Sequence, residues 1–347
     1  MIGAPLVFES EAVALHLVAG IPCAARGVIE LTARGAIADD AHVVLAAAGG
    51  WPHAASLEAE FERVAPNIAV EFAPLEAVTA DKVFDGVAAV AGDQKQRPIS
   101  ITDLPHRTAS ETRAVLAAAG RRIIAGTGKA TDGLVSQWIN RPISRFLSFH
   151  CLKLGWMRPL HATVAAALFG LAMAVCLFCG GQGGLIAGAI LYQIASIVDG
   201  VDGEVARATL RSSKWGATLD TASDALTNFA FISGVCFNIW QQGEQTAALA
   251  GLVGLASLMI GLAVFGAQSL RAGGPLRVDT IKQDAQASGS RLFKAAAKLA
   301  SRDVYALLLV ALIVIGLAGP AMIFFGAAAT IWLVAITIML ARKLSSP

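Results

Sequence analysis

The chain has 347 residues, of which 56% are hydrophobic and only 15% are charged, and its formal net charge at pH 7 is +2. A mean hydropathy of +0.63 excludes a purely soluble globular protein of this length and indicates membrane-spanning segments. The five cysteines lie in or beside apolar segments or in the N-terminal region, and they imply no disulfide framework.

Residues 1–120, the head, mix charged and apolar residues as a soluble α/β domain does. The N-terminus has no basic stretch followed by an apolar run, so we expect no signal peptide. The pattern predicts helices over residues 10–18 and 25–37 and strands over residues 42–47 and 67–72.

A helix start is marked near the end of the head by the capping box Thr108-Ala-Ser-Glu111. In such a box the Thr hydroxyl accepts a hydrogen bond from the backbone N–H of the Glu, and the Glu carboxylate accepts one from the backbone N–H of the Thr. We expect this helix to run to Ala119, with Gly120 as its C-cap.

The head resembles a sugar-nucleotidyltransferase domain over Val18-Ala-Gly-Ile-Pro22, the helix after it and the strand at Val43. The Gly-rich turn with a basic residue that holds nucleotide phosphates is missing from residues 1–11. Gly49-Gly50 does not replace it, because Trp51-Pro52-His53 follows where an Arg or Lys would hold phosphate. We therefore interpret the head as a degenerate, non-catalytic nucleotidyltransferase-like domain.

Residues 121–158 form a basic segment with Asp132 as its single acid and with apolar residues between the charges. This composition predicts an amphipathic helix that lies in the membrane interface and is attracted to anionic head groups. Nucleic acid is a rival partner for a basic cluster, but the adjoining apolar runs argue against it, so we expect no nucleic-acid partner. The basic residues are Arg121, Arg122, Lys129, Arg141, Arg145, Lys153 and Arg158.

Six apolar runs follow, each predicted to be a transmembrane helix. The predicted fold class is therefore an α-helical integral membrane protein with six transmembrane helices in residues 159–347, preceded by a smaller soluble α/β domain. Glycines in the fourth run suit close helix contacts. The runs cover residues 160–179, 183–198, 216–240, 247–270, 304–318 and 320–340.

Lys and Arg are unevenly distributed over the connections between these runs. Residues 180–182, 241–246 and 319 carry none, whereas residues 207–214 and 271–302 are rich in them. By the positive-inside rule, the N-terminal domain, the active site and the C-terminus are cytoplasmic in a multi-pass inner-membrane protein. The basic loop at 271–302 follows from this topology and from contact with anionic lipid, and a phosphorylated acceptor is the alternative partner for it.

Four carboxylates stand out at the ends of the second and third runs. Asp199 and Asp202 are three residues apart, and Asp220 and Asp224 are four apart on one face of the next helix. Carboxylates at membrane depth are costly without a partner, and a set of oxygen ligands without His or Cys favours Mg²⁺ or Mn²⁺ over zinc. We predict a site for two such ions, with one carboxylate free to accept a proton from an attacking hydroxyl.

Three small or basic residues accompany the carboxylates. Gly203 allows a backbone to approach a ligand closely, Ala206 leaves room for a flat base, and Arg207 offers a planar partner for phosphate. A transporter with an acidic cation pathway would also explain intramembrane carboxylates, but it does not explain these three residues.

The pattern Asp-x₂-Asp-Gly-x₂-Ala-Arg-x₈-Gly-x₃-Asp-x₃-Asp over residues 199–224 resembles the signature of the CDP-alcohol phosphotransferase family, and every fixed position is filled. The resemblance implies transfer of a phospho-alcohol group from a CDP-linked alcohol donor to an alcohol or phospho-alcohol acceptor, one partner being a membrane lipid, with release of CMP. It further implies a possible homodimer, as is common among such proteins. The roles it implies are metal binding by Asp199, Asp202, Asp220 and Asp224, catalysis by Asp224 as general base, donor binding by Gly203, Ala206 and Arg207, and close helix packing at Gly216 in the same site.

The residues at 129–144, placed after a nucleotidyltransferase-like head, resemble the di-inositol-phosphate-phosphate synthase branch of that family. That branch implies transfer from CDP-inositol to an inositol phosphate. A phospholipid-type reaction, in which CDP-diacylglycerol donates a phosphatidyl group, needs no active head, and we favour it over the inositol reaction and over a cation transporter.

Overall fold

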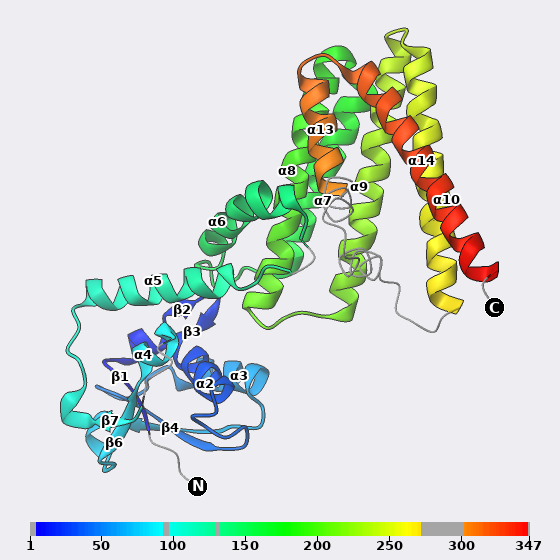
Figure 1. Cartoon of the computed structure of the whole chain (residues 1–347). Helices are drawn as coiled ribbons and strands as arrows, with labels where there is room; N and C mark the ends of the chain where they lie inside the picture. Colours follow the sequence, from blue (N-terminus) through cyan, green and yellow to red (C-terminus); the bar gives the residue numbers. More distant parts are fainter. Residues whose placement is uncertain (1–4, 93–96, 130–131, 272–301, 346–347) are drawn as a thin grey trace. The chain divides into compact units, whose positions relative to one another are not determined.

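The computed structural model describes residues 5–92, 97–129, 132–271 and 302–345 (Figure 1). The chain has an N-terminal α/β domain and a helical C-terminal domain, and it packs into two compact units. The head unit comprises Met1–Gly128, Arg145–Pro159 and Gly203–Ser212, and the helical unit comprises Lys129–Ser144, Leu160–Asp202 and Ser213–Pro347. The domain limits at residues 120 and 158 that the sequence suggests stay predictions.

The head unit is built on a five-stranded sheet with the order β5-β4-β1-β6-β7. Its first four strands are parallel and β7 is an antiparallel edge strand. A separate two-stranded ribbon pairs β2 with β3. The strands are β1 (Leu6–Phe8), β2 (Leu17–Val18), β3 (Ile21–Pro22), β4 (His42–Ala47), β5 (Ala69–Pro74), β6 (Lys82–Asp85) and β7 (Ile99–Ser100).

Helices of the head unit cover one face of this sheet. Leu6 and Phe8 point into the core that these helices form, while Val7 lies in a smaller cluster on the other face, as the alternation of a strand requires. The helices are α1 (Glu11–Leu15), α2 (Cys23–Ala33), α3 (Ala54–Val64), α4 (Gly86–Ala91) and α5 (Ala109–Ala125), with 3₁₀ turns at Leu75–Ala77 and Ile101–Asp103.

Several expectations for the head are wrong in detail. The helix expected over residues 25–37 is α2, which ends at Ala33, and the strand expected over residues 67–72 is β5, which covers Ala69–Pro74. The helix expected over residues 10–18 ends at Leu15, because Ala19 and Gly20 take positive φ values of 50° and 78° and turn the chain into the β2–β3 ribbon. The capping box at Thr108 is confirmed, but α5 runs to Ala125 and Gly120 is not its C-cap. Gly120 instead lies inside the helix, where a Cβ atom would lie 3.4 Å from the Phe149 ring.

The helical unit has a helix at each of the six predicted runs. α8 continues about ten residues beyond its apolar run, which ends at Val198, and it therefore contains the whole Asp199–Arg207 motif. A π-helical turn (Ser136–Asn140) and α6 (Arg141–Cys151) precede these helices. The six are α7 (Pro159–Cys179), α8 (Gly181–Ala208), α9 (Lys214–Gln241), α10 (Gln245–Arg271), α13 (Arg302–Val314) and α14 (Ala318–Ser345).

Two of these helices, α7 and α8, are long and apolar enough to cross a membrane, with mean hydropathies of 2.3 and 1.6 over their most apolar windows. Shorter apolar stretches lie in α10, α13 and α14, at Gln245–Gly261, Asp303–Val314 and Ala318–Val334. By length and composition these two helices can span a membrane, and the six crossings stay a prediction.

Glycines bring α10 and α14 close together, as the sequence predicts for the fourth run. A Cβ atom at Gly254 would lie 2.7 Å from the Cα atom of Gly326, and one at Gly261 would lie 2.3 Å from the Trp332 ring. Small residues let two backbones approach and gain van der Waals contact, which is a main source of helix association in a membrane. The basic loop expected at 271–302 falls, for residues 272–301, outside the described part of the chain.

Candidate functional site

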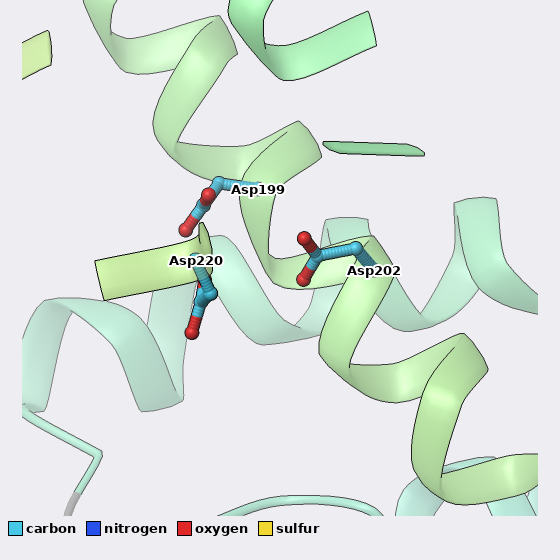
Figure 2. Close-up of side chains that lie close together, drawn as sticks. All are labelled: Asp199, Asp202 and Asp220. Carbon is cyan, nitrogen blue, oxygen red and sulfur yellow. The ribbon is translucent and has the colours of Figure 1, made fainter. Parts of the chain in front are cut away.

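Three of the four predicted carboxylates come together in the helical unit. One oxygen atom of each of Asp199, Asp202 and Asp220 lies within 4.8 Å of the others. Figure 2 shows Asp199 and Asp202 on successive turns of α8, with Asp220 of α9 facing them. The spacing of three residues places the first two on one side of α8, and the sharp turn after α8 returns the chain so that α9 can supply the third.

The start of α9 is fixed by its own cap. The hydroxyl of Ser213 accepts a hydrogen bond of 2.9 Å from the backbone N–H of Gly216, which satisfies one of the free donors of the first turn. Gly216 is exposed in this turn, and its predicted role in helix packing stays a prediction. Asp220 follows one turn later, which places it at the level of the α8 carboxylates.

Asp202 is the most buried of the three carboxylates, with 7% of its surface exposed. The Thr163 hydroxyl of α7 donates a hydrogen bond of 2.7 Å to Asp202 Oδ2. A bond of this kind fixes the orientation of a carboxylate that would otherwise rotate.

We therefore expect Thr163→Val, which keeps the shape and removes the donor, to lower the affinity for the activating cation by about 10–100-fold. The measurement is the Mg²⁺ concentration that gives half-maximal CMP release. Thr221→Val is the matched control, because the Thr221 hydroxyl is exposed and donates to the carbonyl of Ala217 in its own helix. Equal Mg²⁺ dependence of both variants would remove Thr163 from the site.

Asp224 lies beside the three carboxylates without joining their group of described side chains within 4.8 Å. It lines a pocket together with Asp199, Ser223 and Thr227. Asp199 therefore belongs both to the group of three carboxylates and to the pocket, whereas Asp224 lines the pocket from outside that group.

The same pocket has a polar wall built from α8, α9 and the π-helical turn. Tyr192 donates a hydrogen bond to the side-chain carbonyl of Asn228, and the Asn228 amide in turn donates to the Asp224 carbonyl at 2.6 Å. Gln193 donates to Asn140 at 2.8 Å, and Asn140 donates to Ser196 at 3.4 Å. These linked amides and hydroxyls give the pocket both donors and acceptors, which suits a ligand rich in hydroxyl groups.

A fifth carboxylate, Asp303 at the start of α13, also lines this pocket. It accepts a hydrogen bond of 2.9 Å from the Ser136 backbone N–H. A Cβ atom at Gly133 would lie 2.1 Å from Asp303 Oδ1, so only glycine leaves room for this carboxylate. Asp303 thereby ties the segment that carries Asn140 to α13.

Asp132 and Arg141 hold the other end of that segment. Arg141 donates two hydrogen bonds to the Asp132 carboxylate, at 2.8 and 2.9 Å, and a third of 3.4 Å to the Gly200 carbonyl of α8. Burial works to raise the pKa of Asp132, but the hydrogen bonds and the charge of Arg141 outweigh it, and the pKa lies below its usual value of 3.8.

A depressed pKa in the folded state means that Asp132 stabilises the fold above its ordinary pKa and loses this contribution as the pH falls through the folded-state pKa. We expect Asp132→Asn to lower the free energy of unfolding by about 2–3 kcal/mol at neutral pH. The difference between the two proteins should shrink below about pH 4. Thermal unfolding in detergent against pH measures this, with Arg141→Gln and the double variant completing a cycle; a gap that is independent of pH would contradict the ion pair.

The predicted donor-binding residues follow the carboxylates on α8. Arg207 folds back along its helix, so that a Cβ atom at Gly203 would lie 3.0 Å from Arg207 Nη1. Arg207 Nε donates a hydrogen bond of 2.6 Å to the Thr127 carbonyl. Ala206 lies between them in sequence and is half-buried. The assignment of these three residues to a CDP donor stays a prediction.

The carboxylate oxygens of Asp199, Asp202 and Asp220 suit the binding of a divalent cation. Three partly or fully buried carboxylates within 4.8 Å repel one another unless a positive charge lies between them. Their ligand atoms are oxygens, and hard cations such as Mg²⁺ and Mn²⁺ prefer these.

Comparison with known proteins decides the family. The profile of the CDP-alcohol phosphatidyltransferases matches residues 156–341, which is more than half of the chain. The chain belongs to the CDP-alcohol phosphatidyltransferase family. The match begins just before α7 and ends within α14, so it contains all four predicted carboxylates. The expected resemblance is thereby confirmed, and as a member of the family the chain is a transferase.

Several relatives of this CDP-alcohol phosphatidyltransferase are described as bifunctional IPC transferase and DIPP synthase. The relative from Aquifex aeolicus is 38% identical over 109 residues, which is 31% of this chain and 24% of the relative. The one from Thermococcus kodakarensis is 38% identical over 113 residues (33% and 24%), and the one from Archaeoglobus fulgidus is 32% identical over 124 residues (35% and 24%). The similarity thus covers about a quarter of the length of these relatives.

The polar wall of the pocket was not predicted from the sequence. A signal for part of it exists, because Gln193, Ser196 and Asp199 recur every three residues in and just after the apolar run of residues 183–198. Asn140 and Asp303 carry no such signal, since the one lies in a basic juxtamembrane segment and the other is an ordinary acid in the first turn of a helix.

Proposed function

We propose that this chain transfers a phospho-alcohol group from a CDP-linked donor to a hydroxyl group of a polyol acceptor, and that it does so in a membrane. The observation that carries the proposal is the gathering of Asp199, Asp202 and Asp220, with Asp224 at the adjoining polar pocket. Family membership supports the CDP-alcohol chemistry. The acceptor oxygen forms a bond to the phosphorus that carries the donor alcohol, the bond from that phosphorus to the CMP oxygen breaks, and CMP leaves.

The residues divide this work between them. Asp199, Asp202 and Asp220 would hold one or two Mg²⁺ or Mn²⁺ ions, which supply positive charge against the pyrophosphate. Asp224 accepts the proton of the attacking hydroxyl. Gly203, Ala206 and Arg207 bind the CDP moiety, Arg207 through its planar guanidinium.

The relatives favour an inositol reaction for this site. The three that are compared above are all named for DIPP synthesis, and the amide and hydroxyl groups of Asn140, Gln193 and Asn228 suit an acceptor with many hydroxyl groups. We therefore place transfer from CDP-inositol to an inositol phosphate ahead of the phosphatidyl reaction, which reverses the preference drawn from the sequence.

The phosphatidyl reaction remains the second candidate because of the head. In open α/β sheets, ligands bind where the strand order reverses, here between β1 and β6. A Cβ atom at Gly86 would lie 2.2 Å from the Phe8 ring, and the nearby Arg107 is already paired with Asp85. Because side chains occupy this crevice, we infer that the head is non-catalytic. A chain whose head does not make CDP-inositol depends on a donor that another enzyme makes, such as CDP-diacylglycerol.

Exposed apolar side chains on α7 support insertion into a membrane. Leu160, Val164, Leu168, Leu171 and Val175 are each at least 50% exposed in the helical unit, and a stripe of this kind is costly in water. We propose that all six helices cross the inner membrane, with the head, the carboxylates and the C-terminus in the cytoplasm, and that a homodimer forms.

Cys179 tests this topology, because it is exposed and ends α7, the first helix after the cytoplasmic head. Cys179 should react with a membrane-impermeant maleimide in intact cells, and its protection would contradict this sidedness.

The test is CMP release by the purified full-length protein with Mg²⁺. CDP-inositol and CDP-diacylglycerol are each offered with inositol, inositol phosphate, glycerol phosphate and serine. Release that needs CDP-inositol and inositol phosphate supports the first proposal, and release with CDP-diacylglycerol supports the second. A folded protein that turns over neither donor and binds no CMP would overturn both.

A further inference from the structure

We propose that Arg26 of the head is a positioning residue for the donor nucleotide, because it anchors the last turn of α8, which carries Gly203, Ala206 and Arg207. This inference rests on the assignment of those three residues to the CDP donor. It gives the head, which lacks a nucleotide-binding loop of its own, a task in the transferase reaction.

Arg26 lies on α2 and is almost completely buried, with 4% of its surface exposed. One terminal nitrogen of its guanidinium donates a hydrogen bond to the carbonyl of Ala208 and a longer one, of 3.5 Å, to the carbonyl of Ala19. Ala208 is the last residue of α8, and a carbonyl at this position has no partner within its own helix. A cation at a helix C-terminus also faces the negative end of the helix dipole.

The neighbouring carbonyls at the end of α8 are satisfied by the chain itself. The Arg211 N–H donates to the Ala206 carbonyl at 2.8 Å, and the Leu210 N–H donates to the Arg207 carbonyl at 3.3 Å. This is the Schellman arrangement, with Leu210 in the left-handed region at a φ of 55°. Arg26 therefore supplies the partner that this closing turn does not provide for Ala208.

Further contacts hold the same turn against the head unit. Ser148 and Glu204 are both fully buried, and the Ser148 hydroxyl donates to Glu204 Oε2 at 2.7 Å. At the Ala19–Gly20 turn the packing is so close that a Cβ atom at Gly20 would lie 2.8 Å from both Leu152 and Thr209. The end of α8 is thus buried within the head unit.

The side chain of Arg207 is held from the head as well. Its Nε donates to the carbonyl of Thr127, which follows α5. A displacement of the last turn of α8 would therefore move Arg207 relative to this acceptor and change where its guanidinium points. A phosphate-binding guanidinium needs a fixed direction, because its hydrogen bonds to phosphate are directional.

Arg26 remains charged in this environment. Burial lowers its pKa to about 10, and the nearby acid Glu30 works in the opposite direction. A pKa of about 10 still leaves the guanidinium protonated at neutral pH, so the interaction with the end of α8 is that of a cation.

The experiment compares Arg26→Met and Arg26→Lys with the matched control Arg34→Met in the full-length protein in detergent. Arg34 lies just after the same helix, and it donates hydrogen bonds to Glu30 and to the carbonyl of Ala89, both of which belong to the head. We expect Arg26→Met to raise the KM for the CDP donor and the Kd for CMP about tenfold, with kcat and the KM for the acceptor changed less than about twofold. Arg26→Lys should restore most of the donor affinity, and Arg34→Met should behave as the wild type does.

Hydrogen exchange of residues 203–212 gives a second readout that does not depend on turnover. Exchange there should become faster in Arg26→Met and not in Arg34→Met. If Arg26→Met does not fold, Gly20→Ala takes its place, since a methyl group there would lie 2.8 Å from Thr209, would displace the end of α8, and should raise the donor KM in the same way. Unchanged donor KM and unchanged exchange would overturn the proposal.

Failure of the proposed function would look different. A wild-type protein that neither turns over a CDP-alcohol nor binds CMP overturns the donor assignment, and with it the positioning role of Arg26. A wild-type protein that turns over normally, combined with an Arg26→Met variant whose loss is confined to kcat, overturns the role of Arg26 alone.

Discussion

Replacing Asp224 by Asn is expected to lower kcat for CMP release by roughly 10²–10⁴-fold, the range that a positioned general base contributes. The amide keeps the size of the side chain but cannot accept the proton of the attacking hydroxyl. The KM for the CDP donor and the Mg²⁺ dependence should change little, because Asp224 lies outside the group of three carboxylates within 4.8 Å.

The measurement is steady-state CMP release together with binding of CMP to the same protein preparation. Ser223→Ala is the matched control, because Ser223 precedes Asp224 on α9 and also lines the pocket. CMP binding that survives in Asp224→Asn shows that the donor site is intact. Full turnover by this variant would exclude Asp224 as the base, and loss of CMP binding would move it into the metal site.

The grouping of the carboxylates could be predicted from the sequence because the repeat of a single helix decides which of its residues share a face. Asp199 and Asp202 need only the helical repeat to share a face, and a short connection is enough to bring Asp220 of the next helix near them. The six helices of the family domain are predictable for a similar local reason, since each coincides with a mostly apolar run in the sequence.

The frame around the carboxylates depends on packing between segments distant in sequence, and local patterns do not reveal it. Asn140 forms hydrogen bonds with Gln193 and Ser196 of α8, and Asp303 accepts one from the backbone of Ser136, which lies 167 positions earlier in the chain. The end of α8 differs from the sequence prediction for a related reason. An apolar run marks only the part of a helix that is predicted to lie in lipid, whereas α8 continues beyond its apolar run to Ala208, within the head unit.

The second large effect is expected from removal of divalent cations. Chelation should reduce CMP release by roughly 10³-fold or more, because several kcal/mol of charge stabilisation at the transferring phosphate would be lost. Addition of Mg²⁺ or Mn²⁺ should restore release, whereas Zn²⁺ should not, since the three clustered side chains offer oxygen ligands.

Variants assign this dependence to the cluster itself. Asp220→Asn should raise the Mg²⁺ concentration for half-maximal release and weaken CMP binding together, because one charged ligand of three becomes a neutral one. Glu244→Gln is the control for the loss of a negative charge, since Glu244 is exposed beyond the far end of α9.

If chelation abolishes release but Asp220→Asn leaves both the Mg²⁺ dependence and CMP binding unchanged, the cation acts at another place. If the two measures separate, so that the metal dependence shifts and CMP binding does not, the carboxylates hold an ion that does not touch the nucleotide. If the carboxylates hold a cation that also stabilises the bound nucleotide, the Mg²⁺ dependence and CMP binding must weaken together.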